Sequence, residues 1–132
     1  MAWQISFTYL HDHDAVLASF IGVELATLAD VVRWVREVDI RMGTFGRKFD
    51  LLIDLTGLVV KPSAAAEFGR RRAEVLSKHT LSSYRFGGDR PTVTSVYTSS
   101  VLHKAAANPH ATLNDAVAAL KKERETRISR PR

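Results

Sequence analysis

The residues best suited to metal chemistry lie in one short polar segment near the N-terminus. His11, Asp12, His13 and Asp14 are of the types that coordinate divalent cations. In an extended chain, alternation would direct both histidines to one face and both aspartates to the other. A polar connection between two strands accounts for the same residues, and the remaining histidines are isolated in the sequence. We therefore predict a turn here and no metal site.

Two further polar side chains could act in catalysis or switching. Asp54 closes an apolar segment typical of a central strand, near the edge where open α/β sheets bind ligands. Spacing pairs it with no base or nucleophile, and a carboxylate that stabilises a turn is the alternative interpretation. Ser63 lacks the Gly-x-Ser-x-Gly surroundings of a hydrolase nucleophile. We predict that the protein is not an enzyme and uses no cofactor.

Composition narrows the class of protein without giving an activity. The chain has 132 residues, of which 45% are hydrophobic and 25% charged, as expected of one globular domain. It has no cysteine, which excludes disulfides, thiol nucleophiles and Cys-ligated zinc. No apolar run approaches the 18 residues of a membrane span, and the first residues do not resemble a secretory signal. We expect a cytoplasmic protein.

The positive charge is concentrated at the C-terminus. The net charge is +5, and residues 121–132 contain six basic and two acidic side chains, which leaves the body nearly neutral. A basic tail can dock on nucleic acid or an anionic membrane, or it can be a solvated, frayed terminus. The tail has no aromatic residues for base stacking, so nucleic-acid binding is not expected. We divide the chain into a domain at 1–122 and a frayed basic tail at 123–132.

Strand and helix patterns alternate along the chain. Apolar alternation and capping patterns predict, in order, strands at 5–9 and 15–21, a helix at 27–42, a strand at 49–55, a helix at 63–78, a strand at 92–98, a short helix at 99–107, a brief edge strand at 110–111 and a last helix starting near 112. The first two strands form an antiparallel hairpin, and the helical crossovers imply a mainly parallel sheet. The fold class is therefore α/β.

One local motif adds a resemblance to this order. The segment DLLIDLTGL at 50–58, followed by KPSAAA at 61–66 opening a helix, resembles STAS domains, in particular the SpoIIAA-like branch related to bacterial anti-sigma-factor antagonists. The resemblance covers residues 5–122. It implies a four- or five-stranded mixed sheet with about four helices packed on it, and binding rather than catalysis.

The resemblance also points to a switch segment. Signalling members carry Asp-Ser-Ser-Gly where this chain has residues 62–65, and their second serine accepts a phosphate. Ala64 stands at that position here, so the resemblance does not supply a phosphate acceptor. Ser63 is its neighbour at the predicted N-terminus of a helix, where a phosphate would meet free N–H groups. It is either an acceptor in its own right or an ordinary first-turn residue.

One tryptophan of the first predicted helix lies outside the apolar face of that helix. Leu28, Val31, Val35 and Val38 recur at helical spacing, and Trp34 lies about 100° from Val35 around the axis. Trp34 therefore either covers the edge of the core or, if exposed, marks a partner surface.

Two functions fit these observations. The first is a non-enzymatic STAS-like regulatory module in bacterial signalling, which binds a protein partner through a surface formed by Asp54, Thr56, Ser63, Ala64, Arg70, Arg71 and an exposed Trp34. Arg72 is expected to face solvent beside them. The second is a carrier or sensor of a small apolar or anionic ligand, with a pocket between the two helices lined by Val31, Val35, Phe68 and Leu76. A homodimer is compatible with either function.

Overall fold

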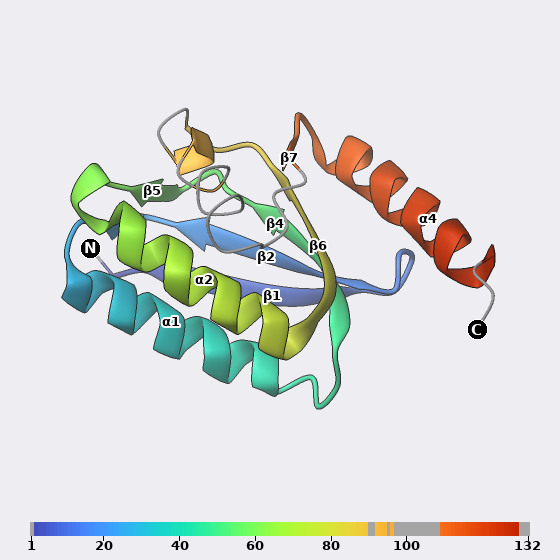
Figure 1. Ribbon diagram of the computed structural model, residues 1–132, viewed down its shortest axis with the longest axis horizontal. Helices are drawn as coiled ribbons and strands as arrows, with labels where there is room; N and C mark the ends of the chain where they lie inside the picture. Colours follow the sequence, from blue (N-terminus) through green and yellow to red (C-terminus); the bar gives the residue numbers. More distant parts are fainter. Residues whose placement is uncertain (1, 90–91, 95, 97–108, 130–132) are drawn as a thin grey trace.

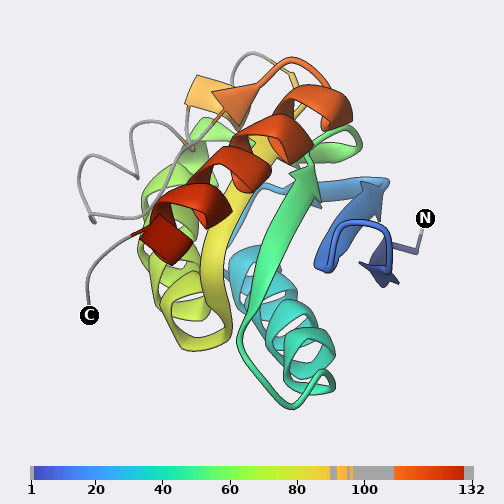
Figure 2. The ribbon, with the colours of Figure 1, turned by 90° about the vertical axis from the view of Figure 1, so that its right-hand side faces the viewer.

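The computed structural model describes residues 2–89, 92–94, 96 and 109–129 and arranges them in three layers (Figures 1 and 2). Helices α1 and α2 lie side by side on one face of a central sheet, and α4 covers the other face. The elements are β1 (Gln4–Leu10), β2 (Ala15–Ile21), β3 (Val23–Leu25), α1 (Leu28–Gly43), β4 (Phe49–Asp54), β5 (Leu58–Val60), the 3-10 turn η1 (Pro62–Ala64), α2 (Ala65–His79), β6 (Thr80–Phe86), β7 (Pro109–His110) and α4 (Leu113–Ser129).

The main sheet has five strands in the order β1-β2-β4-β6-β7. The β1–β2 hairpin is antiparallel, as expected, and every other pairing in this sheet is parallel. Strands β3 and β5 form a separate two-stranded parallel ribbon. The predicted mixed α/β sheet is therefore confirmed, and the β3–β5 ribbon is an addition that the sequence patterns did not indicate.

The central strand β4 is buried on both faces because alternate side chains enter different cores. Leu51 and Ile53 pack under α1 and α2, whereas Leu52 packs under α4. The same alternation divides β6: Tyr84 pairs with Leu52 and joins the α4 core, while Arg85 pairs with Ile53 on the α1–α2 side. Parallel strands and their alternation thus place an arginine in the larger core.

Helix α1 begins where the capping pattern predicts it. Thr27 Oγ1 accepts a hydrogen bond from Asp30 N at 3.1 Å, and Asp30 in turn accepts from Thr27 N at 3.1 Å, which completes a capping box. The buried face, however, runs through Val31, Trp34, Val38 and Met42. Leu28 is 56% exposed, so its expected place in the core was wrong.

The strand expected at residues 92–98 is also wrong. The strand that pairs with β4 on this side of the sheet is instead β6, whose seven residues follow α2 directly. Residues 92–94 and 96 are helical instead, and the Thr92 hydroxyl oxygen accepts a hydrogen bond from Val60 N at 3.0 Å, which joins this segment to β5. The helix predicted at 99–107 lies outside the described residues, whereas the brief edge strand near His110 is confirmed as β7.

The C-terminal helix extends beyond the expected domain boundary. Ala116, Val117 and Leu120 form its buried face, as predicted. The helix continues to Ser129, so the boundary placed after residue 122 falls inside it. Arg124 and Arg127 form ion pairs with the buried Asp50, so this part of the expected tail is fastened to the sheet.

Candidate functional site

The loop after β4 carries the polar residues that the sequence singled out. Asp54 Oδ1 accepts a hydrogen bond from Thr56 N at 2.9 Å, which closes a tight turn and confirms the turn-stabilising interpretation of this carboxylate. Thr56 itself is exposed. Gly57 follows with φ +85°, and a Cβ there would lie 2.2 Å from Phe20 O. The loop therefore packs closely against the end of β2.

Ser63 occupies the exposed first turn before α2. Its hydroxyl donates to Ala26 O at 2.5 Å, which ties η1 to the turn between β3 and α1. Ala64, the position of the family's phosphate acceptor, is 98% buried and has no group to modify. Only Ser63 of this pair is accessible to a partner.

The three consecutive arginines of α2 have two different environments. Arg70 and Arg71 both pair with Glu67, at 2.8 and 3.1 Å, on the outer surface of the helix. Hydrogen bonds from Arg70 and then Arg71 hold the pKa of the Glu67 carboxyl below its usual value. Arg72, which was expected to face solvent, is buried, because it follows Phe68 by one helical turn on the inward face.

Two aliphatic side chains that the sequence patterns did not predict to be exposed lie on either side of β3. Ile21, the last residue of β2, is 63% exposed, and Leu28 begins α1. Strand β3 lies between them in the sequence, and the ribbon that it forms with β5 is held at its two ends, where Val23 N donates to Gly57 O at 3.0 Å and Lys61 N donates to Leu25 O at 2.8 Å. We call the exposed residues around this ribbon, Ile21, Leu28, Thr56, Gly57 and Ser63, the ribbon surface.

Trp34 belongs to the core, which settles its two interpretations in favour of burial. It is 6% exposed and its ring lies 5.2 Å from that of Phe68 and 6.4 Å from that of Phe20, measured between centroids. Its indole Nε1 is buried and finds no hydrogen-bond acceptor among the described residues. The tryptophan is therefore not displayed on the partner surface predicted for it.

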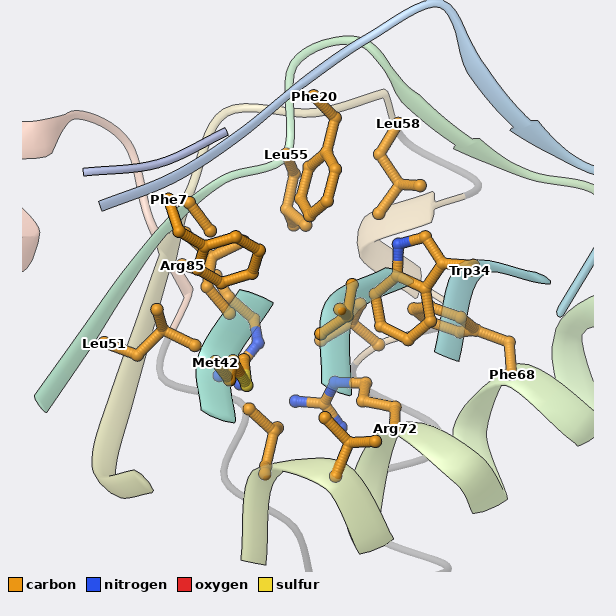
Figure 3. A pocket seen from close by; sticks show the side chains of 16 residues that line it. Phe7, Phe20, Trp34, Met42, Leu51, Leu55, Leu58, Phe68, Arg72 and Arg85 are labelled. Atoms are coloured by element: carbon orange, nitrogen blue, oxygen red, sulfur yellow. The ribbon is translucent and has the colours of Figure 1, made fainter. Parts of the chain in front are cut away.

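A cavity lies between α1, α2 and the sheet (Figure 3). It has a volume of about 30 Å³, room for one or two water molecules. Of the four residues expected to line a pocket, Phe68 and Leu76 do so, while Val31 and Val35 are not among the lining residues. Apart from Trp34, Arg72 and Arg85, the described residues that line it have apolar side chains.

The two arginines of the cavity are among the most deeply buried charged groups described. Arg72 is 3% exposed and Arg85 is 1% exposed. Burial lowers the pKa of the Arg72 guanidinium to about 10. Burial, and after it the charge of Arg72, lowers the pKa of Arg85 well below its usual value. Arg85 also donates to Ser83 Oγ at 2.6 Å. Both residues line the same cavity.

A second buried charge cluster fastens α4 to the sheet. The Asp50 carboxylate accepts from Ser82 Oγ at 2.6 Å, from Arg124 Nη2 at 2.9 Å and from Arg127 Nη2 at 3.0 Å. Burial by itself would raise the pKa of Asp50, but the hydrogen bonds from Arg127, Ser82 and Arg124 outweigh it and hold the pKa below its usual value. The ion pairs of Asp50 with Arg124 and Arg127 therefore fasten α4 to β4.

The His11–Asp14 segment forms the turn of the β1–β2 hairpin. His13 N donates to Leu10 O at 3.1 Å, and Tyr9 Oη donates to Asp14 Oδ1 at 2.5 Å. Across the parts of the chain that the structure describes, no group of three or more histidine, aspartate or glutamate side chains could hold a metal ion.

Comparison with protein-family models and with curated proteins finds no match for this chain. None of the helices within the described ranges has the length and apolar character needed to cross a membrane.

Proposed function

We propose that this protein is a non-enzymatic, STAS-like regulatory module of bacterial signalling, which acts in the cytoplasm by binding a protein partner at the ribbon surface. The α/β fold with a five-stranded mixed sheet is compatible with the STAS resemblance of residues 50–66. Ile21, Thr56 and Gly57 of the ribbon surface lie at the carboxyl ends of β2 and β4, where open α/β sheets commonly bind their ligands.

The observation that carries the proposal is the combination of two exposed aliphatic side chains with an accessible serine. Ile21 and Leu28 each leave more than half of their surface in water. Burying one such side chain under a partner contributes roughly 1.5–3 kcal/mol. An apolar centre with a polar rim is the usual composition of a protein interface. Ser63 supplies a polar group, and its hydroxyl donates to Ala26 O, two residues before Leu28 in the chain.

Ser63 also gives the surface a means of regulation. A phosphate on its oxygen would remove the hydrogen bond to Ala26 O, because the hydroxyl would no longer have a proton to donate. That bond joins η1 to the residues just before α1. Phosphorylation would therefore add charge to the ribbon surface and release one of its internal contacts. Arg70 and Arg71 are already paired with Glu67, so they contribute less to a partner than their charges suggest.

Affinity capture with matched variants tests the proposal. Leu28→Lys places a charge on the ribbon surface, and Ile40→Lys places the same charge on an equally exposed position of the same helix, 60% exposed. We expect the wild type and Ile40→Lys to capture the same partner and Leu28→Lys to lose it, with Ser63→Glu weakening capture. Capture that is indifferent to Leu28→Lys, absence of any specific partner, or capture only of a second copy of this chain would contradict the proposal.

The second candidate function, a carrier or sensor of a small apolar or anionic ligand, is favoured by a separate observation. Among the described residues that line the cavity between the helices and the sheet, three carry polar side-chain groups, and all three groups only donate hydrogen bonds: the Trp34 indole and the guanidinium groups of Arg72 and Arg85. This site is internal and does not overlap the ribbon surface.

A further inference from the structure

Basic side chains from two segments line a surface pocket where α1 and α2 end. The pocket has a volume of about 290 Å³, close to the lower end, about 300 Å³, of the sites that bind small molecules. Arg47 and Lys48 come from the connection between α1 and β4, and Lys78 and His79 come from the last turn of α2. Figure 1 shows both helices ending at the same side of the molecule. Two segments distant in the sequence therefore bring positive charge to one pocket.

The end of α1 is capped without the help of these side chains. Its last carbonyl groups accept hydrogen bonds from the backbone N–H groups of residues 44–46, at 3.2–3.3 Å. Carbonyl groups at the end of a helix need such partners, and here the loop backbone supplies them. Arg47 and Lys48 follow this cap in the chain, so completing the helix end is not what requires their charges.

A carboxylate of α1 holds the two basic groups of α2 in place. Asp39 Oδ1 accepts a hydrogen bond from Lys78 Nζ at 3.1 Å and lies 2.6 Å from His79 Nε2. Hydrogen bonds from His79 and then Lys78 keep the pKa of Asp39 below its usual value, so its carboxyl group is ionised at neutral pH. An ionised carboxylate only accepts hydrogen bonds, so His79 Nε2 carries the hydrogen. This contact fixes the ends of the two helices to each other beside the pocket.

The ion pairs of the pocket are exposed and can be exchanged for a ligand. Arg47 Nη2 lies 3.4 Å from Asp14 Oδ1, and the Arg47 and Lys78 side chains are 63% and 64% exposed. Exposed pairs of this kind contribute little to stability, so replacing one carboxylate by another anion costs little. Lys48 brings a third permanent positive charge, and His79 adds one more when it is protonated. An anion with two negative charges would be attracted by several of these groups at once.

We infer that this pocket binds the phosphate group of a small, soluble phosphate monoester through Arg47, Lys48 and Lys78. A phosphate monoester carries about two negative charges at neutral pH and presents several strong acceptor oxygens. The arginine fork and the lysine ammonium groups are both common ligands of phosphate. The volume also leaves room for an organic part of the ligand beside Met42 and Gly46.

The inference goes beyond both proposed functions. The pocket residues directly precede β4 and β6, so they lie at the amino ends of these strands. The ribbon surface includes the residues at the carboxyl ends of β2 and β4, at the opposite edge of the parallel strands. Partner binding at one edge and phosphate binding at the other can therefore be tested separately.

Nuclear magnetic resonance of the backbone amides tests the site directly. Gly43 and Gly46 line the pocket and report on it, whereas Gly22 and Gly57 lie at the other edge of the sheet and serve as internal controls. We would titrate the full chain with glycerol 3-phosphate at constant ionic strength. Sodium chloride and glycerol are the matched probes for ionic screening and for the organic part. Vesicles of phosphatidylcholine with phosphatidic acid present the same phosphate chemistry as a lipid headgroup.

The expected result is a saturable shift of the Gly43 and Gly46 signals with glycerol 3-phosphate. Lys48→Gln and Arg47→Gln should each weaken binding about fivefold, because each removes an exposed charge that contacts the phosphate. Lys61→Gln is the matched control, since Lys61 is also exposed but pairs with Glu24 in the β3–β5 ribbon, and it should leave binding unchanged. Each of these three variants should keep the urea midpoint of the wild type.

Several results would overturn the inference. One is an equal response to sodium chloride or glycerol, and another is an equal loss of affinity in Lys61→Gln. Binding to the vesicles without binding of glycerol 3-phosphate would assign the surface to a membrane instead. If the basic side chains act only on the ends of the helices, glycerol 3-phosphate will leave both reporter signals in place, and Arg47→Gln or Lys48→Gln will lower the urea midpoint.

Discussion

Removing the Asp50 carboxylate should destabilise the protein more than removing any exposed acid. Asp50 is 5% exposed and accepts hydrogen bonds from Ser82, Arg124 and Arg127. In Asp50→Ala, two arginines lose the anion that compensates them, and Ser82 loses its acceptor. Breaking a buried ion pair in this way typically costs 3–5 kcal/mol.

The structure sets the expected loss near the lower end of that range. The Arg124 and Arg127 side chains are 27% and 33% exposed, so both can recover part of their hydration after the substitution. We expect a loss of about 3 kcal/mol in the free energy of unfolding. For a chain of this length, that corresponds to a decrease of roughly 12 °C in the midpoint of thermal unfolding.

Glu67 provides a matched control because it also pairs with two arginines, but on the outer surface of α2. Glu67→Ala should cost no more than about 1 kcal/mol. Urea unfolding followed by circular dichroism measures both variants against the wild type. A loss below 1 kcal/mol for Asp50→Ala, or equal losses for the two variants, would refute the reasoning that this buried cluster fastens α4 to the sheet.

Two other predictions concern the stability of the same fold. Because the folded-state pKa of Asp50 is lowered, its contribution to stability is present above the unfolded pKa, about 3.9, and is lost as the pH falls through the lower folded value. Urea midpoints should therefore decrease below about pH 4 in the wild type and less steeply in Asp50→Asn, and identical slopes would contradict this. Gly57→Ala should lower the free energy of unfolding by at least about 2 kcal/mol, because the added Cβ would collide with Phe20 O. Gly22 has φ +66° with open space around it, so Gly22→Ala should lower it by only about 1 kcal/mol. Chemical denaturation measures both losses. Equal losses would show that the close approach of the loop to β2 is not what requires glycine.

The sequence predicted the elements whose periodicity is strong and local. The β1–β2 hairpin, the capped start of α1 and the central strand β4 follow from alternation, a capping box and a continuous apolar run. Strand β6 was missed because its sequence, TLSSYRF, contains two adjacent serines and an arginine, and so has neither the alternation of a half-buried strand nor the continuous apolar run of a buried one. The serines and Arg85 are partnered inside the protein, which a polarity pattern does not indicate.

The site residues were harder to place because charged groups were assumed to face water. Helical spacing from Phe68 to Arg72 already indicates the inward face of α2, since four residues make about one turn. Arg72 was nevertheless predicted to face solvent, because its side chain is charged. Trp34 was left outside the predicted apolar face of α1 because that face was defined to include Leu28. Leu28 lies in the first turn of the helix and is exposed. The cavity requires three elements to converge, so no local pattern could have predicted it.

Hydrogen exchange on the protein with its captured partner tests the central claim most directly. The account predicts slower exchange at the ribbon surface, in the segments around Ile21, Leu28 and Ser63, when the partner is bound. Helix α4 and the Arg70–Glu67 surface should exchange as in the free protein. Protection centred on α4 or on the outer face of α2, with no change around Leu28, would contradict the assignment of the ribbon surface as the partner-binding site.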